Sequence, residues 1–176
     1  LDGLELLHDT STAHRPQTNG VAERAVRRVK EGTACALLQS GLQESWWAEA
    51  MECYCMLRNI NDVHADGQTS YVKRFGVGFP GPVIPFGAEV QYLPTSPKDQ
   101  ARLHKMGTKV LPGIFIGYKM HAGGVWSGDL LVADWEEIEN AETHNDIFLK
   151  DIPQKEVIVI KRKDKFIFPA ATQALS

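Results

Sequence analysis

The chain has 176 residues, of which 43% are hydrophobic and 23% are charged, as is typical of a soluble globular protein of one or two small domains. This composition excludes collagen-like, low-complexity and wholly disordered chains, and no apolar run reaches the roughly 18 residues that a membrane-spanning helix requires. The formal charge is 19 basic minus 22 acidic residues, or −3, which for the whole chain is not typical of a nucleic-acid-binding protein.

The charges are unevenly distributed along the chain. Within residues 14–30, five basic residues meet one acidic residue, Glu23, and within residues 98–119 five more meet only Asp99. Within residues 129–146, seven Asp and Glu residues meet no Lys or Arg. Basic patches can therefore form on a mildly acidic protein, and the acidic run is expected to form a solvated face that keeps DNA away.

An amphipathic helix is predicted over about residues 19–39. Its apolar positions fall within one arc of about 120° at roughly 100° per residue. Asn19 is expected to cap this helix and Gly41 to end it. A second helix is predicted over about residues 44–60, and the short connection between the two favours an αα-hairpin. The apolar arc of the first helix comprises Ala22, Ala25, Val26, Val29, Thr33, Ala36 and Leu37.

The amino-acid composition changes after residue 61. Residues 62–87 hold many Gly and Pro and are expected to form a linker. Several short strands without an intervening helix favour a small β-barrel over residues 88–168, and a loose tail is expected at residues 169–176. The strand candidates are residues 88–93, 109–118, 130–135, 156–161 and 165–168.

The three cysteines, Cys35, Cys53 and Cys55, form no CxxC pair, and their odd number argues against a disulfide framework. Cys53 and Cys55 are expected to be buried small hydrophobic residues, and the compartment is expected to be reducing and intracellular. The sequence begins at Leu1 without a signal pattern, and we expect it to be a piece of a longer polypeptide.

Glu23 lies near the start of the first predicted helix, and Arg27 and Lys30 share an arc of about 60° with it. Such a carboxylate can hold a divalent metal while the cations hold a nucleic-acid backbone. The alternative is structural, because the helix dipole favours an acid in the first turn and Glu23–Arg27 is an ordinary i,i+4 pair worth about 0.2–0.5 kcal/mol. Arg24 and Arg28 repel each other at this spacing, and an approaching anion would explain them.

One segment carries a resemblance to a known family. Residues 14–24, His-Arg-Pro-Gln-Thr-Asn-Gly-Val-Ala-Glu-Arg, resemble the last catalytic motif of the integrases of retroviruses and LTR retrotransposons. Four later segments resemble motifs of copia-type integrases in the same order, so that the matches extend over about residues 8–139. These segments are Trp46-Trp47-Ala48-Glu49-Ala50, Thr69-Ser70-Tyr71 with Arg74-Phe75-Gly76, Gly113-Ile114-Phe115-Ile116-Gly117-Tyr118 and Val132-Ala133-Asp134-Trp135.

The resemblance implies an α+β fold. Residues 1–61 would be the C-terminal part of a ribonuclease H-like integrase core, and residues 62–87 would link this helical hairpin to a small SH3-like β-barrel at residues 88–168. The sheet of a complete core is not part of this sequence. We therefore expect the hairpin to keep an exposed apolar face, and the first 60 residues to be marginally stable by themselves.

The chemistry implied by the resemblance is DNA 3′-processing and strand transfer. In that family three carboxylates hold two Mg²⁺ or Mn²⁺ ions, and Glu23 matches the third of these metal ligands. Asp2 and Asp9 lie close to Glu23 in the sequence and precede no strand pattern of the family. We therefore expect the two catalytic Asp residues to be missing and this chain alone to be inactive. The residues expected to contact DNA are Gln17 and Asn19, which match the loop leading into the site, and Arg24, Arg27, Arg28 and Lys30.

We therefore expect a fragment of a retrotransposon Pol polyprotein that is located in the nucleus or in a virus-like particle. The expected partner is DNA, and the parent integrase is expected to form homo-oligomers. Neither a membrane nor a small-molecule substrate is expected as a partner. The alternative is a non-enzymatic remnant of a transposable element that binds DNA or a protein.

Three further sequence patterns have a structural explanation as well as a functional one. Residues 76–81 spell G-x-G-x-x-G, but the prolines that follow exclude the helix that a dinucleotide site requires. Residues 161–165, Lys-Arg-Lys-Asp-Lys, are expected to form a charged hairpin turn, with nuclear localisation or DNA contact as the alternative. The six histidines show no metal-ligand spacing.

Overall fold

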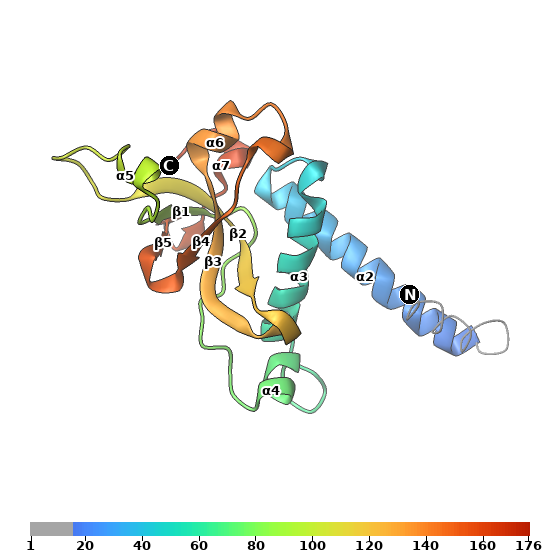
Figure 1. Ribbon diagram of the computed structural model, residues 1–176. Coiled ribbons are helices and arrows are strands. Elements are labelled where there is room, and N and C mark those ends of the chain that lie inside the picture. Colours follow the sequence, from blue (N-terminus) through green and yellow to red (C-terminus); the bar gives the residue numbers. More distant parts are fainter. Residues whose placement is uncertain (1–15) are drawn as a thin grey trace.

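The computed structural model describes residues 16–176 and shows two long helices beside an antiparallel sheet (Figure 1). The long helices are α2 (Pro16–Ser40) and α3 (Trp47–Asn61), which confirms the predicted αα-hairpin. The shorter helical segments are η1 (Glu44–Trp46), α4 (Ser70–Phe75), α5 (Pro97–Gln100), η2 (Ala122–Gly124), α6 (Trp135–Asn140), η3 (His144–Asp146), η4 (Gln154–Glu156) and α7 (Pro169–Thr172).

Five strands form the sheet in the order β4-β3-β2-β1-β5, and all neighbours in it are antiparallel. The first four strands follow one another as neighbours, and β5 returns to pair with β1. Strands β4 and β5 are edge strands that do not pair with each other in residues 16–176, so the expected barrel is an open sheet. The strands are β1 (Glu89–Tyr92), β2 (Leu111–Met120), β3 (Trp126–Asp134), β4 (Lys150–Pro153) and β5 (Val157–Val159), with β6 (Lys161–Arg162) and β7 (Lys165–Phe166) in a separate hairpin.

Strands β1, β2, β3 and β5 lie at predicted positions, but the expectation that no helix intervenes is wrong. Trp135, expected to end a strand, begins α6, because the Asp134 carboxylate accepts hydrogen bonds from the backbone N–H groups of Glu136 and Glu137 and so caps the helix. The expected linker likewise contains α4, which Thr69 caps at its start and Gly76 ends in the left-handed conformation.

Helix α2 differs from its prediction at its start. It already includes Pro16, so Asn19 lies inside the helix and is not its N-cap. Proline fits the first turn of a helix, where its missing N–H would have no intrahelical partner in any case. The end of α2 is as predicted, since Gly41 has a φ of 78° and its N–H donates to the Leu37 carbonyl.

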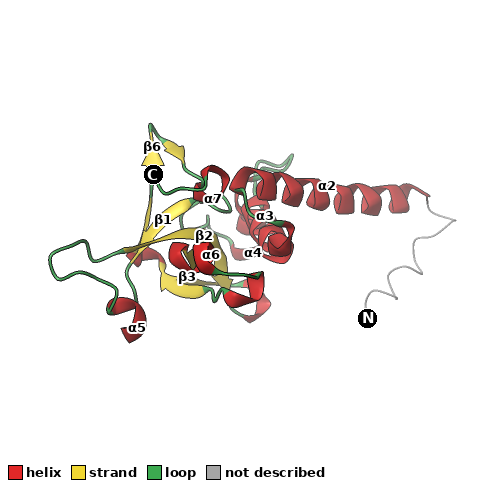
Figure 2. Ribbon diagram, turned by 90° about the horizontal axis from the view of Figure 1, so that it is seen from above, coloured by secondary structure: helices red, strands yellow, loops and turns green. Residues whose placement is uncertain are grey.

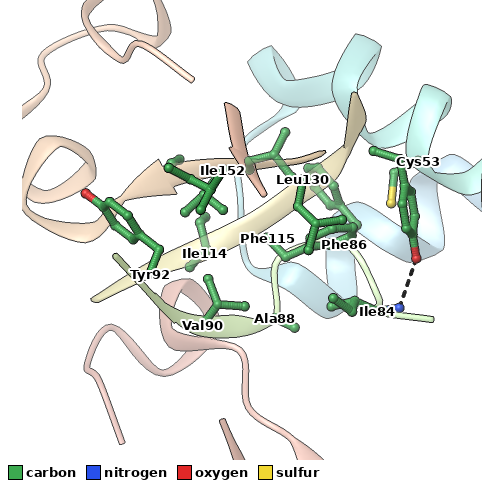
Figure 3. Close-up of a cluster of buried hydrophobic side chains, with 14 of the residues drawn as sticks. Cys53, Ile84, Phe86, Ala88, Val90, Tyr92, Ile114, Phe115, Leu130 and Ile152 are labelled. Carbon is green, nitrogen blue, oxygen red and sulfur yellow. Dashed lines mark hydrogen bonds between the residues drawn. The ribbon is translucent and has the colours of Figure 1, made fainter. Parts of the chain in front are cut away.

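The helices and the sheet share one hydrophobic core (Figure 3). Helix α3 lies between α2 and the sheet, and buries Ala50 and Cys53 against it (Figures 1 and 2). Cys53 is buried as predicted, and burial raises the pKa of its thiol to about 12, whereas Cys55, which was also predicted to be buried, is only partly buried. The predicted domain boundaries stay predictions. The buried side chains of the sheet include Val90, Tyr92, Ile114, Phe115, Leu130, Val132 and Ile152.

The segment between α4 and β1 contributes to this core. Ile84 and Phe86 are almost completely buried. The Tyr118 hydroxyl of β2 accepts a hydrogen bond from the Ile84 N–H at 3.1 Å and donates to the Pro82 carbonyl at 2.7 Å. This part of the expected linker is therefore fixed against the sheet.

Two glycines allow the C-terminal end of α2 to pack closely on the rest of the chain. A Cβ on Gly41 would lie 2.2 Å from the backbone N of Ala171 in the segment of α7, and a Cβ on Gly87 would lie 2.4 Å from the Cβ of Ser40. Both glycines have positive φ angles, of 78° and 86°. The tail that was expected to be loose is thus in contact with the α2–α3 turn, and the Ser176 hydroxyl donates to Glu89 at 2.8 Å.

A network of charged residues joins the segment after β1 to β3 and β4. The fully buried Asp134 carboxylate accepts hydrogen bonds from the Tyr92 hydroxyl at 2.5 Å and from two nitrogens of Arg102 at 3.0 and 3.2 Å. Lys150 lies 2.9 Å from Asp99, which is also buried. The prediction of a solvated acidic face is therefore wrong for Asp134, whose charge is compensated inside the protein.

The network predicts a dependence of stability on pH. Burial alone would raise the pKa of Asp99, but hydrogen bonds and charge, from Lys150 above all, outweigh burial and lower it from 3.8. A lowered folded-state pKa contributes stability above the unfolded pKa, and this contribution is lost as the pH falls through the folded value. We expect Asp99→Asn to lose less stability than the wild type between about pH 6 and about pH 3 in urea unfolding. Equal losses in the two proteins would contradict the role given to Asp99.

Candidate nucleic-acid interface

The N-terminal half of α2 extends away from the sheet (Figures 1 and 2). Every side chain from Val21 to Arg28 is exposed, including Val21 at 59% and Val26 at 56%, whereas Thr33 and Leu37 further along are buried. The apolar arc predicted for this helix is therefore covered only in its C-terminal half. This agrees with the expectation of an exposed apolar face on the hairpin.

Glu23, Arg27 and Lys30 line one shallow groove on the exposed half of α2, together with Ala22, Val26 and Glu31. The i,i+4 ion pair between Glu23 and Arg27, which was the structural alternative, is not formed among residues 16–176. All three side chains are exposed. The arrangement offers two cations and a carboxylate to an external ligand along about two turns of helix.

Arg24 and Arg28 are turned away from this groove. Arg24 reaches back one turn, so that its Nη1 lies 3.3 Å from the position of a Cβ on Gly20. Arg28 Nη2 donates to the Asp62 carboxylate, which follows α3, at 2.9 Å. The four described basic residues of this region, Arg24, Arg27, Arg28 and Lys30, thus do not form one patch, and Arg28 belongs to a second surface at the α2–α3 boundary.

The expected loop residues Gln17 and Asn19 lie on the helical backbone of α2. The prediction of a loop is therefore wrong from Pro16 onwards, because proline fits the first turn of a helix and α2 already begins there. Asp2 and Asp9 lie outside the described residues.

The described residues do not gather the ligands of a metal ion around Glu23. Among residues 16–176, no three His, Cys, Asp or Glu side chains are close enough to hold a metal together. Glu23 is accompanied in its groove by Glu31, two turns further on, and by two cations. The residues in this part of the chain therefore do not fit a two-metal centre by themselves.

Sequence reasoning missed a polar pocket at the C-terminal end of α3. Arg28 and Arg58 both approach Asp62 there, at 2.9 and 3.5 Å. The i,i+4 spacing of Arg58 and Asp62 was visible in the sequence, but their contact with Arg28, 34 residues before Asp62, follows only from the packing of α2 on α3.

The Gly-rich segment, the basic hairpin and His144 lie outside α2. Residues 76–81 follow α4 and contain no helix. The basic residues 161–165 form the β6–β7 hairpin, as expected, with Lys163 and Asp164 at positive φ angles of 52° and 63°. His144 packs against Trp46 and lies 3.2 Å from Glu49, so it joins the 141–147 loop to α3.

Comparisons with known proteins give one match. The chain is similar to the Retrovirus-related Pol polyprotein from transposon TNT 1-94 of Nicotiana tabacum, with 30% identity over 124 residues. The match covers 63% of this chain and 8% of the relative, so the chain spans only a small part of that polyprotein's length. No protein-family model matches the sequence, and no solved structure matches it. The similarity supports an origin of the chain in a retrotransposon Pol polyprotein.

None of the helices in residues 16–176 is long and apolar enough to span a membrane.

Proposed function

We propose that the chain is part of a retrotransposon integrase and that α2 contacts DNA through the groove of Glu23, Arg27 and Lys30. The observation that carries the proposal is the exposed half of α2, on which these charged side chains have no ion-pair partner among the described residues. Phosphate contacts by such cations supply most of the sequence-independent affinity for DNA. The similarity to a retrotransposon Pol polyprotein supports the same function.

The fold assignments of the complete integrase belong to this proposal. Helices α2 and α3 would be the last helices of a ribonuclease H-like core, whose remaining part would cover Ala25, outside the groove. The sheet would derive from an SH3-like barrel. The pairing of β5 with β1 supports this, because closing a small barrel requires the last strand to return beside the first.

Glu23 would supply one carboxylate of a Mg²⁺ or Mn²⁺ site whose other ligands lie outside residues 16–176. The proposal assigns it no further step, because the described residues do not make such a site. The same observation favours a second candidate, a non-enzymatic remnant that binds DNA or a protein. The two candidates differ in what Glu23 does and agree on a DNA-contacting α2.

The salt dependence of DNA binding tests the role of α2. We expect Arg27→Gln with Lys30→Gln to weaken binding of a duplex oligonucleotide and to reduce the slope of log K against log salt by about 1.8, or about 0.9 for each phosphate contact. Fluorescence anisotropy of the 176-residue chain at several salt concentrations measures this slope. Lys105→Gln with Lys109→Gln is the matched control, because these residues lie in the segment after α5, far from α2 (Figure 1).

Glu23→Gln separates the two candidates. In a full-length integrase it should abolish strand transfer while leaving DNA binding nearly intact, whereas in a binding remnant it should change neither. Binding without salt dependence, or equal effects of the two double variants, would contradict a DNA interface on α2.

A further inference from the structure

A polar pocket of 590 Å³ lies where the C-terminal end of α3 meets α2. It is distinct from the groove of Glu23, because Arg28 lies about 140° around the helix axis from Glu23. Its volume is within the roughly 300–1,000 Å³ of small-molecule sites. The pocket is lined by Arg28, Arg58, Asn59, Asn61, Asp62, Val63, His64 and Ser70.

Two arginines from different helices converge on one oxygen in this pocket. Arg28 Nη2 and Arg58 Nε lie 2.9 and 3.5 Å from the same Oδ2 of Asp62. The side chains of Arg28, Arg58 and Asp62 are 58%, 33% and 44% exposed, so an external ligand can reach all three. Two guanidinium groups face one carboxylate, which leaves one positive charge without compensation.

The remaining lining is rich in neutral hydrogen-bond donors. Asn59 and Asn61 carry exposed amide groups, and neither amide has a hydrogen-bond partner among residues 16–176. The hydroxyl of Ser70 and the ring of His64 lie within hydrogen-bond distance of each other, with His64 Nε2 2.8 Å from Ser70 Oγ. Convergent guanidinium groups with amide and hydroxyl donors match the oxygens of a phosphate group, which accepts several hydrogen bonds at once.

We propose that this pocket binds one phosphate group of a DNA backbone, and that Asp62 holds Arg28 and Arg58 in the free protein at the place where the phosphate binds. The inference rests on the proposed function, because it takes the phosphate from the DNA that α2 contacts. It adds Arg58, Asn59, Asn61 and Ser70 to the interface, on a different side of α2. Asp62 acts as an internal competitor, so removing its charge strengthens DNA binding.

The test uses substitutions with opposite expected effects in the 176-residue chain. Asp62→Asn frees the two arginines and should tighten binding of a duplex oligonucleotide and steepen the salt slope by about 0.9, the value for one added phosphate contact. Arg58→Gln should weaken binding and flatten the slope by about the same amount. Asp66→Asn is the matched control, because it removes a carboxylate from the same loop and frees Lys73, 2.9 Å away, outside the pocket.

The outcomes of this test are distinct. A steeper slope for Asp62→Asn with no change for Asp66→Asn supports the pocket, and this gain cannot come from a failure to fold. Equal gains in both variants overturn it in favour of diffuse surface charge. An unchanged affinity with a lower melting temperature for Asp62→Asn overturns it in favour of a purely structural ion pair at the end of α3.

Inorganic phosphate identifies the source of the ligand. If phosphate alone shifts the backbone or side-chain amide NMR signals of Asn59 and Asn61 while the Asp62 and Arg58 variants leave DNA binding unchanged, the pocket is a free-phosphate site and the DNA assignment is wrong. If Arg27→Gln with Lys30→Gln has no effect while Arg58→Gln does, the proposed groove on α2 fails and the pocket stands.

Discussion

Gly41→Ala is expected to destabilise the chain by about 2–5 kcal/mol. An L-residue in the left-handed conformation costs about 1–2 kcal/mol, and Gly41 has a φ of 78°. Its new Cβ would also lie 2.2 Å from the backbone N of Ala171, and such overpacking costs about 1–3 kcal/mol. Backbone atoms cannot turn aside as a flexible side chain can, so α7 has to separate from the α2–α3 turn. Urea unfolding followed by tryptophan fluorescence measures the loss.

Gly67→Ala separates the two contributions. Gly67 has a φ of 83° with no atom within 4 Å of a Cβ, so its replacement should cost only the conformational part, about 1–2 kcal/mol. The excess loss at Gly41 then measures the packing of α7. If the two variants lose the same stability, α7 does not pack against the turn in solution.

Asp134→Ala is expected to cost about 3–5 kcal/mol, as for other buried ion pairs from which one partner is removed. The substitution leaves the buried Tyr92 hydroxyl without its acceptor and removes the N-cap of α6, and Arg102 keeps only its contacts with Glu136 and Asp99. Asp134→Asn keeps an acceptor for the cap, so we expect it to lose less. Thermal and urea unfolding of both variants check the order.

Asp151→Ala is the control for a pair at the surface. Asp151 lies 3.7 Å from Lys119, and both side chains are nearly half exposed. Such pairs contribute about 0–1 kcal/mol. A loss at Asp134 as small as the loss at Asp151 would show that Glu136 and Asp99 are sufficient partners for Arg102 and that the Tyr92 hydroxyl finds another acceptor.

The parts of the fold that were predictable from the sequence have a local cause. The periodicity of apolar residues between Ala22 and Leu37 and the position of Gly41 were enough to predict α2 and its end. The alternating and apolar runs around Val90 and Phe115 likewise predicted β1 and β2. In each case residues within one turn or one strand determine the structure.

The parts that were missed depend on distant partners. Asp134 appeared to belong to an acidic surface, because its partners Tyr92 and Arg102 are 42 and 32 residues away. The strand β4 has only four residues and ends in a proline, so no periodicity was visible. The open sheet also could not be distinguished from a barrel, since strand order does not follow from the strands themselves.

In the candidate site, too, the features that depend on local geometry were predictable and those that depend on packing were not. The groove of Glu23, Arg27 and Lys30 follows from helical geometry, so it was predictable once the helix was. The separation of Arg28 from that groove was also implicit in the geometry, but its pairing with Asp62 requires the angle at which α3 crosses α2. The pocket around Arg58 is therefore a product of packing, and no local pattern marks it.

The exposed half of α2 affects how freely this segment of the sequence can vary among related retrotransposons. From Val21 to Arg28 no side chain is buried, and substitutions at exposed helix positions usually change stability by about 0.5 kcal/mol or less. Substitutions that add or remove a charge there should therefore leave the melting temperature nearly unchanged. Selection acting on folding alone would leave this segment free to vary, so a retained pattern of basic residues on it across relatives would record selection for a bound partner.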